Sequence, residues 1–209
     1  MRIAGTAKVR CPACDREHEA ELVQSINTRE DPESKRRLLA GELNVLACDC
    51  GRGRNPTTMQ LAAKLVFYDP DADYFCQVVP AGDVAEAALA FRAAGATGTL
   101  RVVPTQNALV EKVKILDAGL EDWAIEMTKL LLLAATGGDL DRVLLFQHVD
   151  EAAIHWLRFD DDEPRQVASP VASYARLAAR LESRPAHDEL QIDRAWAVIA
   201  VQQLIASGN

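Results

Sequence analysis

Long apolar runs are missing from this chain of 209 residues, which restricts where it can reside. The longest one, from Leu130 to Ala135, is far shorter than the roughly 20 residues that a membrane-spanning helix needs. The first residues also lack the basic segment and apolar stretch of a secretion signal, because a cysteine pair stands where that stretch would lie. These absences predict a cytoplasmic protein with no membrane partner.

Positive charge is also scarce. The chain has 23 basic and 31 acidic residues, so its formal net charge is -8 at pH 7. Proteins that bind nucleic acid regardless of sequence neutralise phosphates with lysine and arginine, so this balance predicts no nucleic-acid partner. A nucleic-acid-binding zinc ribbon stays one of the functions to consider, but it would require a basic face with exposed aromatic side chains.

Common catalytic motifs are missing as well. The sequence contains no glycine-rich nucleotide-binding motif, no nucleophile elbow and no H-E-x-x-H motif of zinc proteases. The order of a zinc deaminase, in which H-x-E precedes the cysteine pair, is absent because the C-x₂-C pair comes before every histidine. We therefore predict no catalytic residues and no organic cofactor.

What the sequence does contain is two close pairs of cysteines on either side of a charged stretch. Cys11 and Cys14 have the C-x₂-C spacing of a zinc knuckle, and Cys48 and Cys50 follow with one residue between them. Two tight turns can aim four sulfurs at one point, which is what a tetrahedral Zn²⁺ requires. In a reducing compartment, paired cysteines are metal ligands more often than disulfides. We therefore predict that these four cysteines hold a structural zinc ion.

The C-x-C pair leaves the fourth ligand open. Its turn is tighter than that of a C-x₂-C pair, so one of the two sulfurs can point away from the metal. In that case His18 or Asp49 is the nearest substitute ligand, although an exposed polar residue on a strand is the simpler interpretation of His18. The fifth cysteine, Cys76, has no neighbouring histidine and indicates a buried, inert thiol.

Periodicity and turn signals predict an α+β fold with two lobes on one continuous framework. We expect a zinc-ribbon-like lobe over residues 1–80, with a helix inserted at 32–43, packed on a helix-rich body over residues 81–209 that has short antiparallel strands. The expected strands cover 17–23, 61–69, 74–79, 99–103, 142–149, 153–159 and 166–168, and the stretch from 51 to 58 is expected to be an exit loop. The expected helices cover 32–43, 84–94, 109–120, 123–131, 169–181 and a terminal segment after Asp193.

Two groups of charged residues on these helices are expected to face water. Helix 32–43 begins at Asp31-Pro32-Glu33, which supplies a cap and an acidic first turn. Its basic triplet indicates a solvated face and, less often, a partner surface. That triplet is Lys35, Arg36 and Arg37, and the residues expected on the outside of the two long helices are Glu111, Lys112, Lys114 and Glu126.

A second chemistry would need one of two further clusters. Asp117, Glu121 and Asp122 gather where the two long helices meet, and His148 and His155 lie on two strands that are expected to pair. Helix caps and ordinary hydrogen bonds explain these residues. The alternative is a metal-dependent enzyme that uses them as acid and base or as ligands of a second metal.

Several uncommon short segments follow one another along residues 9–133. They are Cys11-Pro12-Ala13-Cys14, Ser25-Ile26-Asn27, Asp31-Pro32, Leu38-Leu39-Ala40-Gly41-Glu42-Leu43-Asn44, Cys50-Gly51, Phe67-Tyr68-Asp69-Pro70, Pro80, Arg101-Val102-Val103, Leu109-Val110-Glu111-Lys112-Val113 and Asp117-Ala118-Gly119-Leu120-Glu121-Asp122. With these segments the chain resembles the bacterial CpXC-domain family, which is named for two Cys-Pro-X-Cys motifs. The resemblance implies a four-cysteine zinc site. In place of the second motif this chain has Ala47-Cys48-Asp49-Cys50, so Cys48 is displaced by one position and the proline is missing.

The leading hypothesis is a non-enzymatic interaction or scaffold module with a structural zinc ion and protein partners. It rests on the closed thiolate set, because a structural zinc site has no open position for a substrate. The enzyme that uses the 117–122 cluster or the strand histidines is the alternative. No feature of the sequence indicates an oligomeric state.

Overall fold

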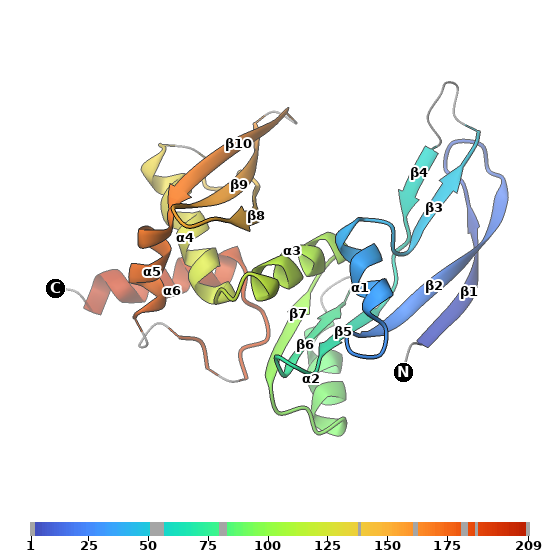
Figure 1. The fold of residues 1–209 in the computed structure, drawn as a ribbon, viewed down its shortest axis with the longest axis horizontal. Helices are drawn as coiled ribbons and strands as arrows, with labels where there is room; N and C mark the ends of the chain where they lie inside the picture. Colours follow the sequence, from blue (N-terminus) through green and yellow to red (C-terminus); the bar gives the residue numbers. More distant parts are fainter. Residues whose placement is uncertain are drawn as a thin grey trace. The chain divides into compact units, whose positions relative to one another are not determined.

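A computed structural model describes residues 3–50, 57–79, 83–137, 139–160, 163–180, 184–186 and 188–207. The chain forms two compact units, Met1–Leu109 and Val110–Asn209, and the division falls within helix α3 (Gln106–Asp117). Both units combine helices with sheets, which confirms the predicted α+β class (Figure 1). The predicted lobe over residues 1–80 lies within the first unit, and its status as a separate lobe stays a prediction.

The first unit is built on a five-stranded mixed sheet. In spatial order its strands are β1 (Ile3–Arg10), β2 (Glu17–Asn27), β5 (Leu65–Asp69), β6 (Tyr74–Val78) and β7 (Thr99–Val103). The pairs β1–β2 and β5–β6 are antiparallel, whereas β2–β5 and β6–β7 are parallel. In the predicted β5–β6 hairpin, the Asp69 carboxylate accepts the Asp71 N–H at 3.1 Å and so stabilises the turn.

Helix α1 (Pro32–Leu39) begins as the sequence predicts and ends earlier. The Asp31 carboxylate accepts the Ser34 N–H at 3.0 Å, which caps the first turn. The predicted end at Leu43 is wrong because Gly41 takes a φ of +71°. The Glu42 N–H then bonds to the Arg37 carbonyl at 2.8 Å, the arrangement of a Schellman motif. Helix α2 (Val84–Ala93) matches its prediction closely.

A two-stranded hairpin, β3 (Val45–Cys48) and β4 (Thr57–Gln60), was not predicted. The expected exit loop over residues 51–58 ends sooner, since β4 starts at Thr57; residues 51–56 lie outside the described part of the chain. Just before β3, the buried Asn44 bonds to both backbone groups of Val23, accepting its N–H at 2.7 Å and donating to its carbonyl at 2.9 Å. Asn44 therefore fixes the base of the hairpin to β2.

The second unit packs helices against a three-stranded antiparallel sheet. Its elements are the rest of α3, α4 (Asp122–Ala135), β8 (Leu144–Val149), β9 (Ala153–Asp160), β10 (Glu163–Pro170), α5 (Val171–Ala178) and α6 (Arg194–Ser207). The core contains Trp123, Phe146 and Trp156, each at most 2% exposed. The third strand is longer than predicted. Among the described helices, none has the length and apolar character needed to span a membrane.

The expected outward placement of the charges on α3 and α4 is wrong for most of them. Lys112 and Glu126 are buried, at 6% and 8% exposure, and Glu111 is half-buried. The cause is that α4 is enclosed on all sides between residues 122 and 130, so no solvent-facing stripe remains there. Charged side chains inside such a unit must pair. Lys112 pairs with Asp122, and both Glu111 and Glu126 pair with Lys129.

Candidate metal centre

The first cysteine pair lies in the turn between β1 and β2. The Cys11 N–H donates to the Arg16 carbonyl at 3.0 Å, and the Asp15 N–H donates to the Cys11 carbonyl at 2.8 Å. Asp15 closes this turn with a φ of +59°, a left-handed conformation that aspartate tolerates better than most residues. The turn therefore fixes Cys11 and Cys14 at the tip of the first hairpin.

The second pair lies where β3 ends. Cys48 is the last residue of that strand, opposite Thr57, and Cys50 follows two positions later. The Asn44 contacts with Val23, just before β3, tie the start of this strand to β2. An exposed ion pair from Arg16 to Asp49, at 3.0 Å, joins the two tips and contributes little on its own.

The four sulfurs form one cluster. All of their Sγ atoms lie within 4.8 Å of one another. Two of the contacts cross from one hairpin to the other: Cys11 to Cys50 at 3.5 Å and Cys14 to Cys48 at 3.8 Å. These sulfurs are too far apart for disulfides, which need about 2.05 Å. Around a tetrahedral ion with metal–sulfur bonds of about 2.3 Å, neighbouring sulfurs lie roughly 3.8 Å apart, so four free thiols here have the spacing to hold one metal ion.

Backbone groups of the first turn favour a thiolate. Hydrogen bonding from the Ala13 N–H lowers the pKa of Cys11 to about 7, against the opposing effect of burial and with help from Cys50 and Cys14. The pKa of Cys48 is raised instead. Hydrogen bonding from the Cys50 N–H lowers this pKa, but burial and the contacts with Cys14 and Cys11 together raise it by more. A bound metal ion would deprotonate both thiols.

The structure thus brings all four predicted ligands together, including the displaced Cys48. The Asp49 carboxylate is 87% exposed and pairs with Arg16. His18 lies on β2 opposite Val9. Neither belongs to the sulfur cluster, so the geometry favours four cysteines over a mixed set. That the cluster binds metal in the protein stays a prediction.

The strand histidines do meet, as expected. His148 and His155 are cross-strand partners whose rings stack 4.3 Å apart. The His155 Nε2 lies 2.7 Å from the Asp150 carboxylate, and this contact, with the N–H groups of Ala153 and Ala152, lowers the pKa of Asp150 to about 2. In the described part of the chain, the cysteines form the only group of three or more candidate ligands that lie close enough to share a metal.

The acids at the junction of the long helices have separate roles. Asp122 is buried against Lys112, with its carboxylate 2.9 Å from the Nζ. The Glu121 carboxylate accepts the Trp123 indole N–H at 3.2 Å, and Asp117 is exposed. These contacts hold helix ends and a core ion pair in place.

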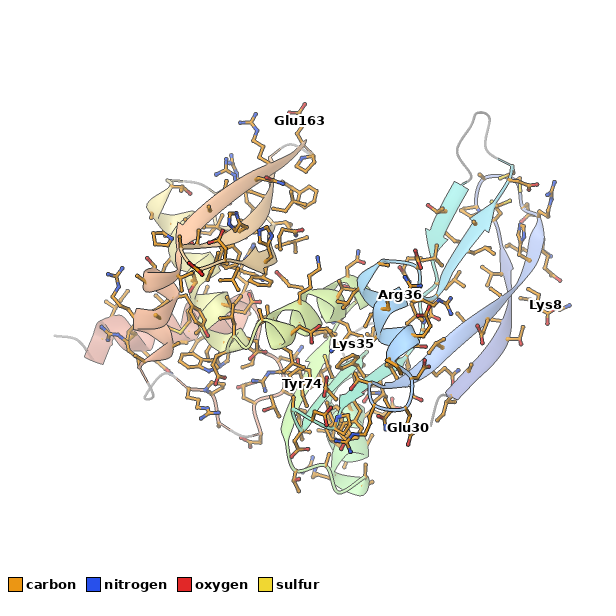
Figure 2. The ribbon with its side chains drawn as sticks, viewed as in Figure 1. Lys8, Glu30, Lys35, Arg36, Tyr74 and Glu163 are labelled. Carbon is orange, nitrogen blue, oxygen red and sulfur yellow. The ribbon has the colours of Figure 1, made fainter. Side chains whose placement is uncertain are left out.

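The basic triplet of α1 also has partners of its own. Lys35 Nζ lies 3.5 Å from the Asp69 carboxylate, and Arg36 forms a bidentate pair with Glu33, at 2.8 and 2.9 Å. Figure 2 labels Lys35 and Arg36 on α1. Arg37 donates to the Glu42 carbonyl at 3.4 Å. Arg36 is exposed, as expected for a solvated face, whereas Lys35 and Arg37 are half-buried, so the triplet faces water only in part.

The geometry defines a class: an α+β protein in which two hairpin tips present four thiols to one point. Comparison with models of protein families matches residues 9–129 to the family described as CpXC protein. Because the match spans more than half of the chain, the protein belongs to the CpXC family. Comparisons with curated proteins and with solved structures found no match. All four cysteines lie within the matched segment, whereas the strands β8 to β10 and helices α5 and α6 lie beyond it.

Proposed function

We propose that Cys11, Cys14, Cys48 and Cys50 bind one Zn²⁺ ion, which joins the two hairpin tips into a zinc-ribbon-like lobe. The observation that carries this proposal is the crossing of the sulfur contacts, at 3.5 and 3.8 Å, from one hairpin to the other. Four thiolates in tetrahedral array suit zinc, and iron is the main competitor for such a set. Zinc is the better candidate for a site whose task is to close a fold.

The apolar contacts near the tips support a structural role. Among the described residues, the cluster that joins β2 to the β3–β4 hairpin has three buried members, Ala20, Leu46 and Leu61. So small a cluster stabilises a hairpin weakly, because each buried aliphatic side chain contributes about 1.5 to 3 kcal/mol before the entropy of ordering is subtracted. A structural zinc ion contributes on the order of 10 kcal/mol in small metal domains.

The biochemical role that we propose is a cytoplasmic, non-enzymatic scaffold that binds protein partners. Four thiolates would complete the coordination shell and leave no site for substrate on the metal. Zinc–thiolate sites also require a compartment that keeps cysteine reduced. The charged groups of the enzyme alternative are engaged in pairs and caps, which favours the scaffold.

Metal analysis of the purified full chain tests this proposal. We expect one zinc per chain by elemental analysis and no visible absorption of an iron–thiolate centre. Cys48→Ser should lower the zinc content or affinity at least tenfold, whereas Cys76→Ala, which removes the buried thiol outside the cluster, should leave it unchanged. A metal-replete preparation without zinc, or equal zinc affinity in the Cys48 variant, would contradict the four-cysteine site. Metal-dependent hydrolysis or deamination by the chain would contradict the scaffold role.

A further inference from the structure

A hollow of about 470 Å³ lies within the second unit, between α4, α5 and α6. Its volume falls in the range of small-molecule sites, about 300 to 1,000 Å³. Its apolar wall contains Leu131 and Leu132 of α4 and Leu204 of α6. Its polar side contains Ser173, Arg176 and Arg180, which recur about once per turn along α5 and just beyond its end. The hollow is therefore apolar on one side and basic on the other.

The apolar wall is partly open to solvent. Leu131 is 39% exposed, although the residues of α4 before it, from Asp122 to Leu130, are all buried. Its exposure coincides with the hollow, which indicates that the helix surface lacks a covering side chain there. A ligand with an apolar chain would remove this surface from water.

Among the described residues, no carboxylate neutralises the two arginines at the hollow. Both are exposed, and Arg176 donates to the Ser173 hydroxyl at 3.3 Å. Neither guanidinium pairs with a carboxylate in the described residues, in contrast to Arg36, Lys64 and Lys112. In a chain with a net charge of -8, two unpaired arginines beside an apolar wall attract an anion.

We infer that this hollow binds a single-chain amphiphile with an anionic head group. The apolar chain would lie against Leu131, Leu132 and Leu204. The head group, a carboxylate or a phosphate, would meet Arg176 and Arg180, since a guanidinium binds both anions through paired N–H donors. The inference goes beyond the proposed zinc site and does not depend on it. All of these residues lie outside the segment matched to the family.

The size of the hollow favours a small ligand over a macromolecule. Two turns of a helix about 10 Å across occupy roughly 850 Å³, which exceeds the available volume. Segments that recognise anionic membranes cluster about four to eight basic residues, whereas the hollow has two. An acidic peptide and a membrane surface are therefore the competing outcomes of the test.

Titration of the full chain with short probes tests the inference. The probes are decanoate and decyl phosphate, with decanol as a chain without charge and acetate as a head group without a chain, all below micelle-forming concentrations. Leucine methyl NMR should show saturable shifts at Leu131, Leu132 and Leu204 with both anionic probes. Decanol should bind about tenfold more weakly, because it lacks the charge-assisted hydrogen bonds, and acetate should not bind.

Variants separate the two sides of the hollow. The double change Arg176→Gln and Arg180→Gln should weaken decanoate binding about tenfold, to the level of decanol, and leave decanol binding unchanged. Ala135→Phe, which fills the hollow from α4, should abolish the binding of both. Arg92→Gln on the exposed face of α2 removes the same charge elsewhere and should change neither.

Three results would overturn the inference. The first is no saturable binding of either anionic probe. The second is binding that the double arginine variant leaves intact. The third is binding of an acidic amphipathic helical peptide, or of vesicles containing phosphatidylserine, by a chain that does not bind decanoate; this would assign the arginines to a protein or to a membrane.

Discussion

In the first unit, four thiols stand at the ends of two hairpins that share a small apolar cluster. In the second, two lysines and three carboxylates lie against a core that contains Trp123 and Trp156. The first arrangement stays available to solvent, since Cys14 is exposed, and in our proposal it is completed by an added ion. The second neutralises its charges from within. The comparison shows that a thin layer of hairpins and a thick helical core require different ways of holding polar groups.

The charges of the second unit form one connected network. Lys112 Nζ lies 2.9 Å from the Asp122 carboxylate and donates to the Ile192 carbonyl at 2.6 Å. Lys129 Nζ lies 2.8 Å from Glu111 and 2.9 Å from Glu126. Burial alone would lower the pKa of Lys129, but attraction to Glu126 and Glu111 outweighs it and raises that pKa. The two carboxylates therefore keep Lys129 charged despite its burial.

Removal of the metal should give the largest effect and should be confined to the first unit. All three tryptophans, Trp123, Trp156 and Trp196, lie in the second unit, so their fluorescence reports on that unit alone. With a strong chelator or with Cys11→Ser, we expect amide protection in β1 to β4 to be lost, because a structural zinc contributes on the order of 10 kcal/mol. Tryptophan emission should stay native. A shift in that emission, or hairpin amides that stay protected without metal, would contradict the comparison.

Breaking the buried network should give the next effect, in the other unit. Lys112→Met leaves the Asp122 carboxylate buried without its cation, so we expect a loss of about 3 to 5 kcal/mol in the free energy of unfolding. Urea unfolding followed by tryptophan fluorescence measures this loss. Lys114→Met, on the same helix but without an ion pair to a described residue, should cost less than about 0.5 kcal/mol. Equal losses for the two variants would show that the buried ion pair contributes no more to the free energy of unfolding than a surface lysine does.

Asn44→Ala tests how the second hairpin is positioned. It removes both hydrogen bonds to Val23 and leaves buried backbone groups unpaired. It also places alanine at a φ of +52°, a left-handed conformation that asparagine tolerates better. We expect a loss of about 2 to 3 kcal/mol in the stability of the first unit and faster exchange of the Val23 amide. Zinc affinity should fall as well, because β3 carries Cys48. Unchanged zinc affinity would indicate that the thiols find their positions without this anchor.

The smallest effect concerns the exposed Asp150–His155 pair of the second unit. An NMR titration should give Asp150 a pKa of about 2, and His155→Ala should move that pKa upward. Because the folded pKa lies below the unfolded value of about 3.9, the stabilising contribution is complete above that value and is lost as the pH falls toward 2. Acid unfolding should show this dependence in the parent and less of it in the variant. An Asp150 pKa unchanged by the variant would assign the shift to the Ala152 and Ala153 N–H groups.

Local signals in the sequence predicted the starts of two helices well, whereas strand β1 was not predicted and β5 begins four residues later than expected. Asp31 with Pro32 marks the start of α1, and Asp193, whose carboxylate accepts the Trp196 N–H at 3.0 Å, marks α6. In both caps the carboxylate bonds to an N–H only three residues along the chain, so the sequence alone is enough to predict them. The end of α1 was harder to predict, because Leu43 continues the apolar pattern while Gly41 turns the chain.

Long-range pairing explains what the sequence could not predict. Periodicity shows that Lys112 and Glu126 leave the apolar stripe of their helices, but it cannot show that a second layer covers them. Likewise, the displaced Cys48 looks unsuited to a zinc knuckle as long as its turn is considered alone. Its position is set by β3, whose base is tied to Val23 through Asn44, and no local pattern encodes that contact. The only local sign of this contact is Asn44 itself, which follows Gly41-Glu42-Leu43 just after the end of α1.

The parallel pairing of β2 with β5 affects the order in which this chain can fold. The segment between them carries α1 and the β3–β4 hairpin, so the central sheet closes only after a long excursion. A cross-link from Cys11, just before β2, to Cys50 would tie the far end of β2 to the middle of that excursion and shorten the loop left to close. The ion would then act as an assembly factor during synthesis, and a chain that matures without it would close its sheet more slowly and expose the edge of β2 for longer.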